Sequence, residues 1–218
     1  GMTAPSVIIA DYGIGNLLSV ARAIEKAGGT PEISRDPEKL AGAERLILPG
    51  VGAFGDCMRS FLECGFEEPV RHFAATGRPL LGLCVGMQIF FDRSEEFGEH
   101  RGLGLIPGDV RAIPKTDVDG HLLKTPHIGW SDLQMPAASN TPTWDEGVLR
   151  GLEPGTAMYF VHSYTAWPAS PAHRYADALY GGHLICAVTR KDNITGTQFH
   201  PEKSGPAGLS LMTNFLDF

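Results

Sequence analysis

A cysteine with a glycine two residues away on each side is the most chemically suggestive feature of the chain. The segment GLCVG at residues 82–86 follows an apolar run at residues 79–83 and precedes a stretch with helical character. This pattern is typical of a nucleophile elbow with sulfur in place of oxygen, in which small neighbours keep side chains out of the substrate's path. The following helix favours a thiolate, and its first N–H groups suit an oxyanion. We therefore predict that Cys84 is a nucleophile; the alternative is a buried structural cysteine.

Three polar residues are placed to assist this thiol. His200 ends an expected strand and precedes a proline, which biases it toward an extended backbone. Glu202 faces the same side in extended geometry, where its carboxylate can hold the imidazole tautomer and stabilise the imidazolium. Gln88 lies one helical turn after Cys84 on the same face, so its amide can hold a substrate beside the thiol. We predict a Cys84–His200–Glu202 triad next to Gln88.

The composition narrows the class of protein. The 218 residues carry a formal net charge of −7, which gives no general drive toward nucleic acid or an anionic membrane. Because the chain has no apolar run of membrane-spanning length and no secretory pattern, we expect a soluble, cytoplasmic enzyme. Gly1 ahead of Met2 is interpreted as a cloning remnant. The four cysteines have neither CxxC spacing nor companion histidines at zinc-ligand spacing, so no metal, cofactor or disulfide framework is expected.

The elements expected in the first half alternate between strands and helices. The expected strands cover residues 6–10, 31–34, 45–48 and 79–83, and the expected helices cover residues 17–27, 56–62 and 67–75. This alternation predicts an α/β fold with a doubly wound, mostly parallel sheet, whose ligand site lies beyond the carboxyl ends of the strands. The loops at residues 11–16 and 49–54 and Cys84 all follow strands, so we expect them at that edge. A dinucleotide site in the first loop is disfavoured, because Leu18 occupies the third glycine position.

The second half is rich in strands that have no helices between them. We expect strands at residues 105–113, 127–130, 157–164, 183–189 and 194–199, a terminal helix at residues 208–215, and a surface loop at residues 135–155. Antiparallel additions to the main sheet are the natural interpretation. Since no linker or repeat divides the chain, residues 2–218 are expected to form one domain.

Six short motifs resemble those of a known family. GLCVGMQ at residues 82–88 and FHPEKS at residues 199–204 resemble the two signatures of class I (triad-type) glutamine amidotransferases. Four others resemble the glutaminase subunits of imidazole glycerol phosphate synthases, which act in histidine biosynthesis: DYGIGN at 11–16, PGVGAF at 49–54, HIGW at 127–130 and YFVHSY at 159–164. The resemblance covers essentially the whole chain and implies a flavodoxin-like α/β fold.

The resemblance implies hydrolysis of L-glutamine through a γ-glutamyl thioester on Cys84. His200 would protonate the departing ammonia and then activate water, while Glu202 orients His200. The implied oxyanion donors are Val51, Gly52 and Val85, and the implied glutamine-binding residues are Gly52, Gln88, Ser163 and Tyr164. Because Val51 lies between two glycines, we hypothesise that its loop turns inward only when the acceptor enzyme carries its substrate.

The family also implies a partner, a separate (β/α)8-barrel cyclase that uses the ammonia to make imidazole glycerol phosphate and aminoimidazole carboxamide ribotide. By this similarity, four residues would lie at or near the interface of the heterodimer: Asn16, Trp130, Tyr159 and Lys203. From the residues alone, Trp130 and Tyr159 are more typical of core aromatics, and Lys203 of a solvated charge. Three alternatives stay open: a glutaminase for another synthase, such as pyridoxal phosphate or anthranilate synthase; a stand-alone γ-glutamyl hydrolase; and a non-catalytic regulatory subunit.

Overall fold

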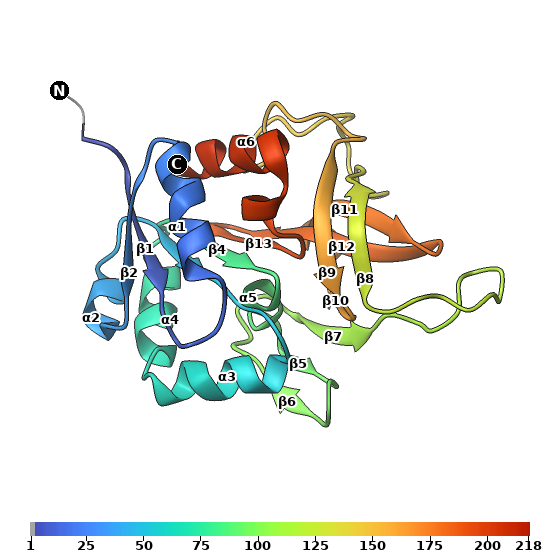
Figure 1. The fold of residues 1–218 in the computed structure, drawn as a ribbon, viewed down its shortest axis with the longest axis horizontal. Helices are drawn as coiled ribbons and strands as arrows, with labels where there is room; N and C mark the ends of the chain where they lie inside the picture. The colour runs from blue at the N-terminus through green and yellow to red at the C-terminus, as the bar shows by residue number, and fades with distance from the viewer. Residues whose placement is uncertain (1–2) are drawn as a thin grey trace.

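A seven-stranded sheet forms the centre of the fold. The structure is a computed structural model that describes residues 3–218. Gly1, the expected cloning remnant, lies outside the described residues. The strand order is β11-β12-β13-β4-β3-β1-β2 (Figure 1). The five strands from β13 to β2 are parallel, and β12 and β11 extend one edge in antiparallel orientation. The strand bounds are β1 Ser6–Ala10, β2 Thr30–Ser34, β3 Leu46–Leu48, β4 Leu80–Leu83, β11 Arg174–Tyr180, β12 His183–Lys191 and β13 Ile194–Thr197.

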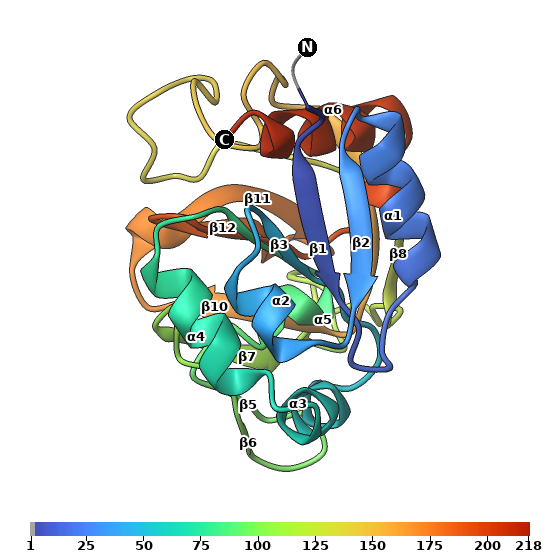
Figure 2. The same ribbon diagram turned by 90° about the vertical axis from the view of Figure 1, so that its left-hand side faces the viewer.

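Helices cover both faces of this sheet. On one face lie α1 (Leu17–Lys26) and α6 (Gly205–Leu216); on the other lie α2 (Pro37–Ala41), α3 (Phe54–Glu63), α4 (Glu67–Ala75) and the short α5 (Val85–Gln88) (Figure 2). Every residue of β3 and β4 is buried, as a parallel sheet covered on both faces requires. The doubly wound, mostly parallel arrangement expected from the alternation of strands and helices is confirmed.

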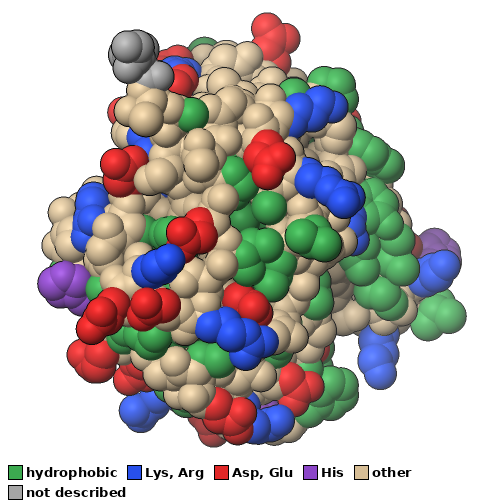
Figure 3. Space-filling model, turned by 60° about the vertical axis from the view of Figure 1, so that its left-hand side comes forward, with side chains coloured by type: hydrophobic (Ala, Val, Ile, Leu, Met, Phe, Trp, Pro, Cys, Tyr) green, Lys and Arg blue, Asp and Glu red, His purple; other side chains and the backbone are tan. Residues whose placement is uncertain are grey.

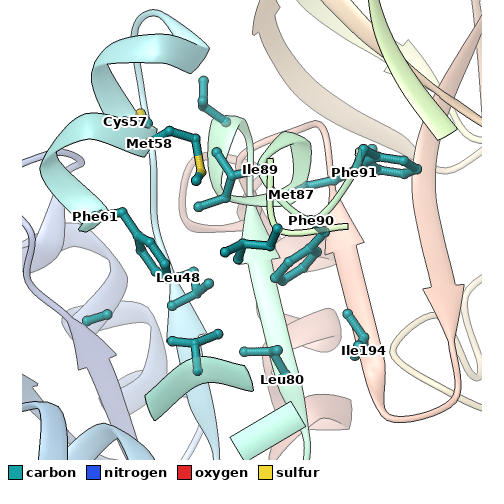
Figure 4. Packing of buried hydrophobic residues seen from close by; sticks show 14 of the residues in the cluster. Leu48, Cys57, Met58, Phe61, Leu80, Met87, Ile89, Phe90, Phe91 and Ile194 are labelled. Atoms are coloured by element: carbon teal, nitrogen blue, oxygen red, sulfur yellow. The ribbon is translucent and has the colours of Figure 1, made fainter. Parts of the chain in front are cut away.

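The hydrophobic core between the sheet and α3 lies directly beneath the elbow. Figure 4 shows Leu48 and Leu80 from two neighbouring strands, Phe61 from α3 and Phe90 from the segment after α5 around one interior. All four side chains are fully buried. Because burying one large apolar side chain contributes about 1.5–3 kcal/mol, this cluster fixes β4 and α5 relative to each other. The turn at Cys84 therefore rests on a rigid base.

Most elements of the first half lie within two residues of their expected bounds. The strand at residues 6–10 and the helix at residues 67–75 match the expectation, whereas the terminal helix begins at Gly205, three residues early. The helix α2 was not expected from the sequence, although its start has a recognisable signal. Pro37 is its first residue, and the Asp36 side chain accepts a hydrogen bond from the Glu38 N–H.

The strands of the second half correct the expectation that they all extend the main sheet. The strands β11, β12 and β13 do belong to that sheet, and β13 pairs in parallel with β4; β11 was not expected. The strands expected at residues 105–113, 127–130 and 157–164 belong to two smaller sheets, of order β10-β7-β5-β6 and β8-β9. Their bounds are β5 Arg93–Ser94, β6 His100–Arg101, β7 Gly108–Ala112, β8 His127–Asp132, β9 Ala157–His162 and β10 Tyr164–Pro168. Apolar alternation identifies a strand but not its neighbour, which explains the error.

The surface mixes charges of both signs with exposed hydrophobic side chains. Figure 3 shows hydrophobic groups gathered between scattered acidic and basic ones on one face. Two exposed large hydrophobic residues, Ile128 and Trp130, lie on β8. Across residues 3–218, the helices are too short or too polar to cross a membrane. The two-stranded sheet therefore presents apolar area to its surroundings.

Candidate active site

Cys84 lies at the junction between β4 and α5, as the elbow motif predicts. Its backbone angles, φ 55° and ψ −115°, fall in a region that residues other than glycine rarely occupy. Three hydrogen bonds hold this conformation: the Cys84 N–H donates to the Thr197 carbonyl at 2.7 Å, and the Cys84 carbonyl accepts from the N–H groups of Met87 at 3.1 Å and Gln88 at 3.3 Å. The strained turn thus keeps the sulfur of a nearly buried residue at a defined position.

The glycines beside Cys84 are required by the backbone beneath the elbow. A Cβ atom on Gly86 would lie 2.0 Å from the carbonyl oxygen of Leu48, and one on Gly82 would lie 2.6 Å from the carbonyl oxygen of Gly86. These positions allow β3, β4 and α5 to approach closely. The physical reason for the glycines therefore differs from the one that the sequence suggested, which was access for the substrate.

We expect Gly86→Ala to destabilise the protein by about 1–3 kcal/mol, because the added methyl group must displace backbone atoms of β3. Gly42→Ala is a matched control, since its Cβ would meet its nearest neighbour, the Glu38 carbonyl oxygen, at an ordinary 3.4 Å. Urea unfolding followed by circular dichroism measures both variants. Equal stability of Gly86→Ala and the unaltered protein would contradict the close approach described here.

His200 and Glu202 form a buried pair beside Cys84. His200 Nδ1 lies 2.7 Å from Glu202 Oε1, and both side chains are almost inaccessible. Burial alone lowers the pKa of His200, but hydrogen bonds to Cys84 and Glu202 and the negative charges of both outweigh it and raise the pKa to about 10. The imidazolium is therefore favoured at neutral pH. The three residues predicted to form the triad are brought together.

The backbone of His200 is tied to β9. Its N–H donates to the Tyr159 carbonyl at 3.0 Å. The Ser204 hydroxyl donates to the His200 carbonyl at 2.7 Å and accepts from the Tyr159 N–H at 3.0 Å. The position of the imidazole is thus set by the two-stranded sheet as well as by the end of β13.

The loop at residues 49–52 presents a carbonyl group to the elbow. The Gly50 carbonyl accepts from the Val85 N–H at 3.2 Å, and the Val51 carbonyl accepts from the Cys57 thiol at 3.3 Å. Because the C=O and N–H of a trans peptide point in opposite directions, this arrangement turns the Val51 N–H away from Val85. In this conformation the Val85 N–H is occupied by the Gly50 carbonyl and the Val51 N–H points away from it. These two implied oxyanion donors therefore do not converge on the thiol.

A pocket of about 180 Å³ opens at the sulfur of Cys84. Its volume is below the range of about 300–1,000 Å³ that is usual for drug-sized ligands, so it suits a small metabolite. The residues expected to serve in catalysis, oxyanion binding or glutamine binding line this pocket, with one exception. Glu202 does not line it but pairs with His200. The lining residues among them are Val51, Gly52, Cys84, Val85, Gln88, Ser163, Tyr164 and His200.

The hydrogen bonds of Gln88 determine which atom of its amide faces the pocket. Its amide nitrogen donates to the Tyr164 carbonyl at 3.1 Å and to Gln198 Oε1 at 3.0 Å, which uses both amide hydrogens. Its side-chain carbonyl oxygen is therefore the atom that Gln88 can offer to a ligand, as an acceptor. Gln88 lies at the expected place, but the structure fixes which end of the amide is free.

The sequence analysis missed Glu96, which also lines the pocket. Its Oε1 accepts from the Phe54 N–H, the first of α3, at 2.7 Å. Burial raises the pKa of Glu96, while the hydrogen bond from Phe54 opposes that rise. A carboxylate at this position can bind an ammonium group. The acidic residues Glu95, Glu96 and Glu99 lie close together in the sequence, but such clusters usually lie on solvated surfaces.

Two buried histidines were not expected either: His162, which lines the pocket, and its neighbour His127. His127 Nδ1 lies 2.8 Å from His162 Nε2, and His162 Nδ1 lies 2.9 Å from the Tyr164 carbonyl oxygen. Because a carbonyl can only accept, His162 carries its proton on Nδ1 and accepts from His127 at Nε2. Burial lowers the pKa of His127 to about 4 and that of His162 to about 3, so both rings are neutral. They support the segment that carries Tyr164.

The residues implied at a partner interface lie at the surface or next to it. The Trp130 side chain is 57% exposed and its ring contacts that of Tyr159, with centroids 5.9 Å apart. This exposure contradicts the interpretation of Trp130 as a core aromatic. Lys203 is exposed, and the exposed Asn16 caps α1 by accepting from the Ser19 N–H.

One group of possible metal ligands lies outside this site. Asp117, Asp119 and His121 bring three ligand atoms within 4.8 Å of one another. However, Asp117 Oδ1 already accepts from the N–H groups of Asp119 and His121 at 2.9 Å each. These bonds stabilise a turn, which explains the cluster without an ion.

The chain belongs to the class I glutamine amidotransferases, whose family model matches residues 8–217. The elbow, the buried His–Glu pair and the α/β sheet agree with this class of enzyme. The chain is similar to imidazole glycerol phosphate synthase subunit HisH 1 of Legionella pneumophila, with 48% identity over 97% of this chain and 98% of the relative. It is 47% identical to subunit HisH of Rhodospirillum rubrum, over 96% and 97% of the two chains. Among solved structures, PurLQS from Thermotoga maritima shares the fold, with a TM-score of 0.70 and 18% identity over 99% of each chain.

Proposed function

We propose that the chain is the glutaminase subunit of an imidazole glycerol phosphate synthase, which hydrolyses L-glutamine to glutamate and ammonia for histidine biosynthesis. The observation that carries this conclusion is the meeting of Cys84, His200 and Glu202 at a metabolite-sized pocket. Near-full-length identity of 47–48% to two HisH subunits favours this synthase over the alternatives. A regulatory subunit without catalysis would not need a complete triad.

The reaction uses the triad in two steps. The Cys84 sulfur attacks the side-chain amide carbon of glutamine, and His200 gives a proton to the nitrogen as the C–N bond breaks and ammonia leaves. Water then attacks the γ-glutamyl thioester and gives a proton to His200, while the carbon–sulfur bond breaks and glutamate is released. Glu202 holds the Nδ1–H of His200 throughout, so Nε2 is the nitrogen that exchanges protons.

Glutamine recognition follows from the atoms that the pocket offers. The free carbonyl oxygen of Gln88 accepts from an N–H group of the substrate, and the Glu96 carboxylate pairs with the α-ammonium group. Gly52, Ser163 and Tyr164 line the same pocket and complete the contacts. This assignment keeps all four glutamine-binding residues that the resemblance implied and adds Glu96.

We further propose that the loop at residues 49–52 is in a resting conformation. The hydrogen bond from the Val85 N–H to the Gly50 carbonyl supports this, because an oxyanion cannot use that N–H while the carbonyl holds it. Rotation of the peptide between Gly50 and Val51 releases the Val85 N–H and turns the Val51 N–H inward. Glycine on each side of Val51 makes such a rotation sterically accessible.

The partner proposed for this chain is a separate (β/α)8-barrel cyclase subunit. Ammonia released into water at neutral pH becomes mostly unreactive ammonium, so a docked acceptor enzyme is required. The exposed Trp130 with Tyr159, together with Lys203 and Asn16, would lie at the interface. We propose one domain over residues 2–218, acting in the cytoplasm, where the free thiols of its four cysteines stay reduced.

Reconstitution with the cyclase tests this function. We expect the isolated chain to hydrolyse glutamine slowly. Addition of purified barrel cyclase and its phosphoribosyl ribotide substrate should raise the rate of hydrolysis at least about tenfold, because the resting loop then turns inward. Glutamate release and formation of imidazole glycerol phosphate measure the two half-reactions. Fast hydrolysis by the isolated chain, unchanged by these additions, would exclude the resting loop. Failure to form a complex would exclude the proposed synthase.

A further inference from the structure

A series of buried hydrogen bonds ends at the sulfur of Cys84. The Tyr164 carbonyl accepts from Gln88 Nε2, the same nitrogen donates to Gln198 Oε1, and Gln198 Nε2 lies 3.8 Å from Cys84 Sγ. Gln198 is completely buried, and it is absent from the lining of the pocket. It therefore contacts the nucleophile from the protein side, where no substrate reaches.

The orientation of the Gln198 amide follows from the chemistry of its neighbours. The Tyr164 carbonyl can only accept, so Gln88 must present its NH₂ group there. The second hydrogen of that group reaches Gln198, which must present its oxygen. The remaining end of Gln198, its NH₂ group, then faces the sulfur. Reversing both amides would bring two oxygens to 3.1 Å at Tyr164, so only one assignment is consistent.

We propose that Gln198 is a further catalytic residue of the glutaminase reaction, whose amide N–H stabilises the Cys84 thiolate and fixes the position of the sulfur for attack. A hydrogen bond to an ionised acceptor is stronger than one to its neutral form, and water does not compete at a buried site. This inference rests on the proposed role of Cys84 as the nucleophile.

The surroundings of the sulfur explain why such a donor is needed. The Val161 carbonyl oxygen lies 3.9 Å from Cys84 Sγ, where it accepts from a thiol and repels a thiolate. His200 supplies a positive charge from the pocket side. Gln198 is a neutral donor on the protein side, and it offsets the carbonyl of Val161. Because Gln198 does not line the pocket, it makes no direct contact with glutamine, and it reaches the substrate-binding residues only through the amide of Gln88.

Alkylation of Cys84 in the full-length chain tests the proposal without any turnover. We expect Gln198→Met, which keeps the length of the side chain but removes the donor, to slow carbamidomethylation of Cys84 by iodoacetamide at pH 7 about tenfold. The pH at which alkylation is half-maximal should move upward by about one unit. Peptide mass spectrometry reads Cys84, and the half-buried Cys64 in the same digest is the internal control. A folded Gln198→Met chain with an unchanged Cys84 profile overturns the proposal.

Steady-state kinetics with the cyclase complex gives a second readout. We expect Gln198→Met to lower kcat for glutamine hydrolysis; KM can rise as well, because the variant also removes the acceptor of Gln88 Nε2. A rise in KM with kcat unchanged would overturn the proposal. Should the variant not fold, the side-chain amide resonances of Gln198 in the unaltered chain decide instead. We expect them to shift with pH at the midpoint of Cys84 alkylation, and resonances that do not respond to that titration overturn the proposal. The role of Cys84 as the nucleophile is tested separately, by whether Cys84→Ala retains glutamine hydrolysis. The alkylation and resonance measurements on Gln198 do not depend on that outcome.

Discussion

Replacing Cys84 by alanine is expected to abolish glutamine hydrolysis, with a loss of at least about 10⁴-fold in kcat, because no thioester can form. Synthesis of imidazole glycerol phosphate from added ammonium salts by the complex should persist, since the cyclase receives ammonia directly. The fold should also persist, because alanine retains the Cβ atom within the rigid elbow. Parallel assays with glutamine and with ammonium chloride measure the two activities.

Cys64→Ala is the matched control, since Cys64 caps the far end of α3 and is only half-buried. It should retain both activities. Loss of the glutamine-dependent and the ammonium-dependent activities together in Cys84→Ala would mean that Cys84 has a structural role. Such a result would remove the enzymatic assignment of the pocket.

Replacing Glu202 by glutamine is expected to lower kcat by about 10²- to 10⁴-fold, because a neutral amide does not stabilise the His200 imidazolium and no longer selects its tautomer. Glu202 Oε1 accepts from His200 Nδ1, whereas Oε2 is buried and has no hydrogen-bond partner among the described residues. A glutamine would therefore place either an N–H against the ring or an unpaired donor in the core. Purified complex assayed at saturating glutamine measures the effect.

The same substitution should change the pH dependence in a defined direction. The pKa of His200 is raised to about 10, so its protonated form persists at neutral pH and is lost as the pH rises through that value. Removing the charge and hydrogen bond of Glu202 removes one cause of the rise, and the alkaline limb of the rate profile should move down by at least about one pH unit. An alkaline limb at the same pH in Glu202→Gln would show that the carboxylate does not control the imidazolium.

The catalytic residues were predictable because each leaves a local signature. An elbow requires small residues around Cys84, and Glu202 lies only two residues after His200. The predicted pairing is present, but the extended backbone expected between them is wrong: residues Pro201–Lys203 form a 3-10 turn, and this turn brings the carboxylate to the imidazole. These constraints involve few neighbours, so a pattern of a few residues records them. The parallel sheet was predictable for a similar reason, since alternating strands and helices allow few arrangements.

What the sequence did not reveal depends on contacts between distant segments. The free end of the Gln88 amide is decided by Tyr164 and Gln198, and the orientation of the Gly50 carbonyl by Val85. The strand expected at residues 157–164 is interrupted at Ser163, so that its two parts pair with different sheets. No periodicity in a single segment encodes such choices, because each depends on which partner the fold supplies.

The hydrogen bonds between Tyr159 and the turn that carries His200 have a mechanical consequence. They fasten the acid–base group to β9, in a ribbon of two strands that lies outside the seven-stranded sheet. A slight tilt of that ribbon would displace the imidazole and the Val161 carbonyl beside the sulfur, while the backbone of Cys84 stays anchored in the elbow. Pressure on the exposed Trp130 of β8 would therefore change how His200 is aligned with Cys84, and with it the transfer of protons.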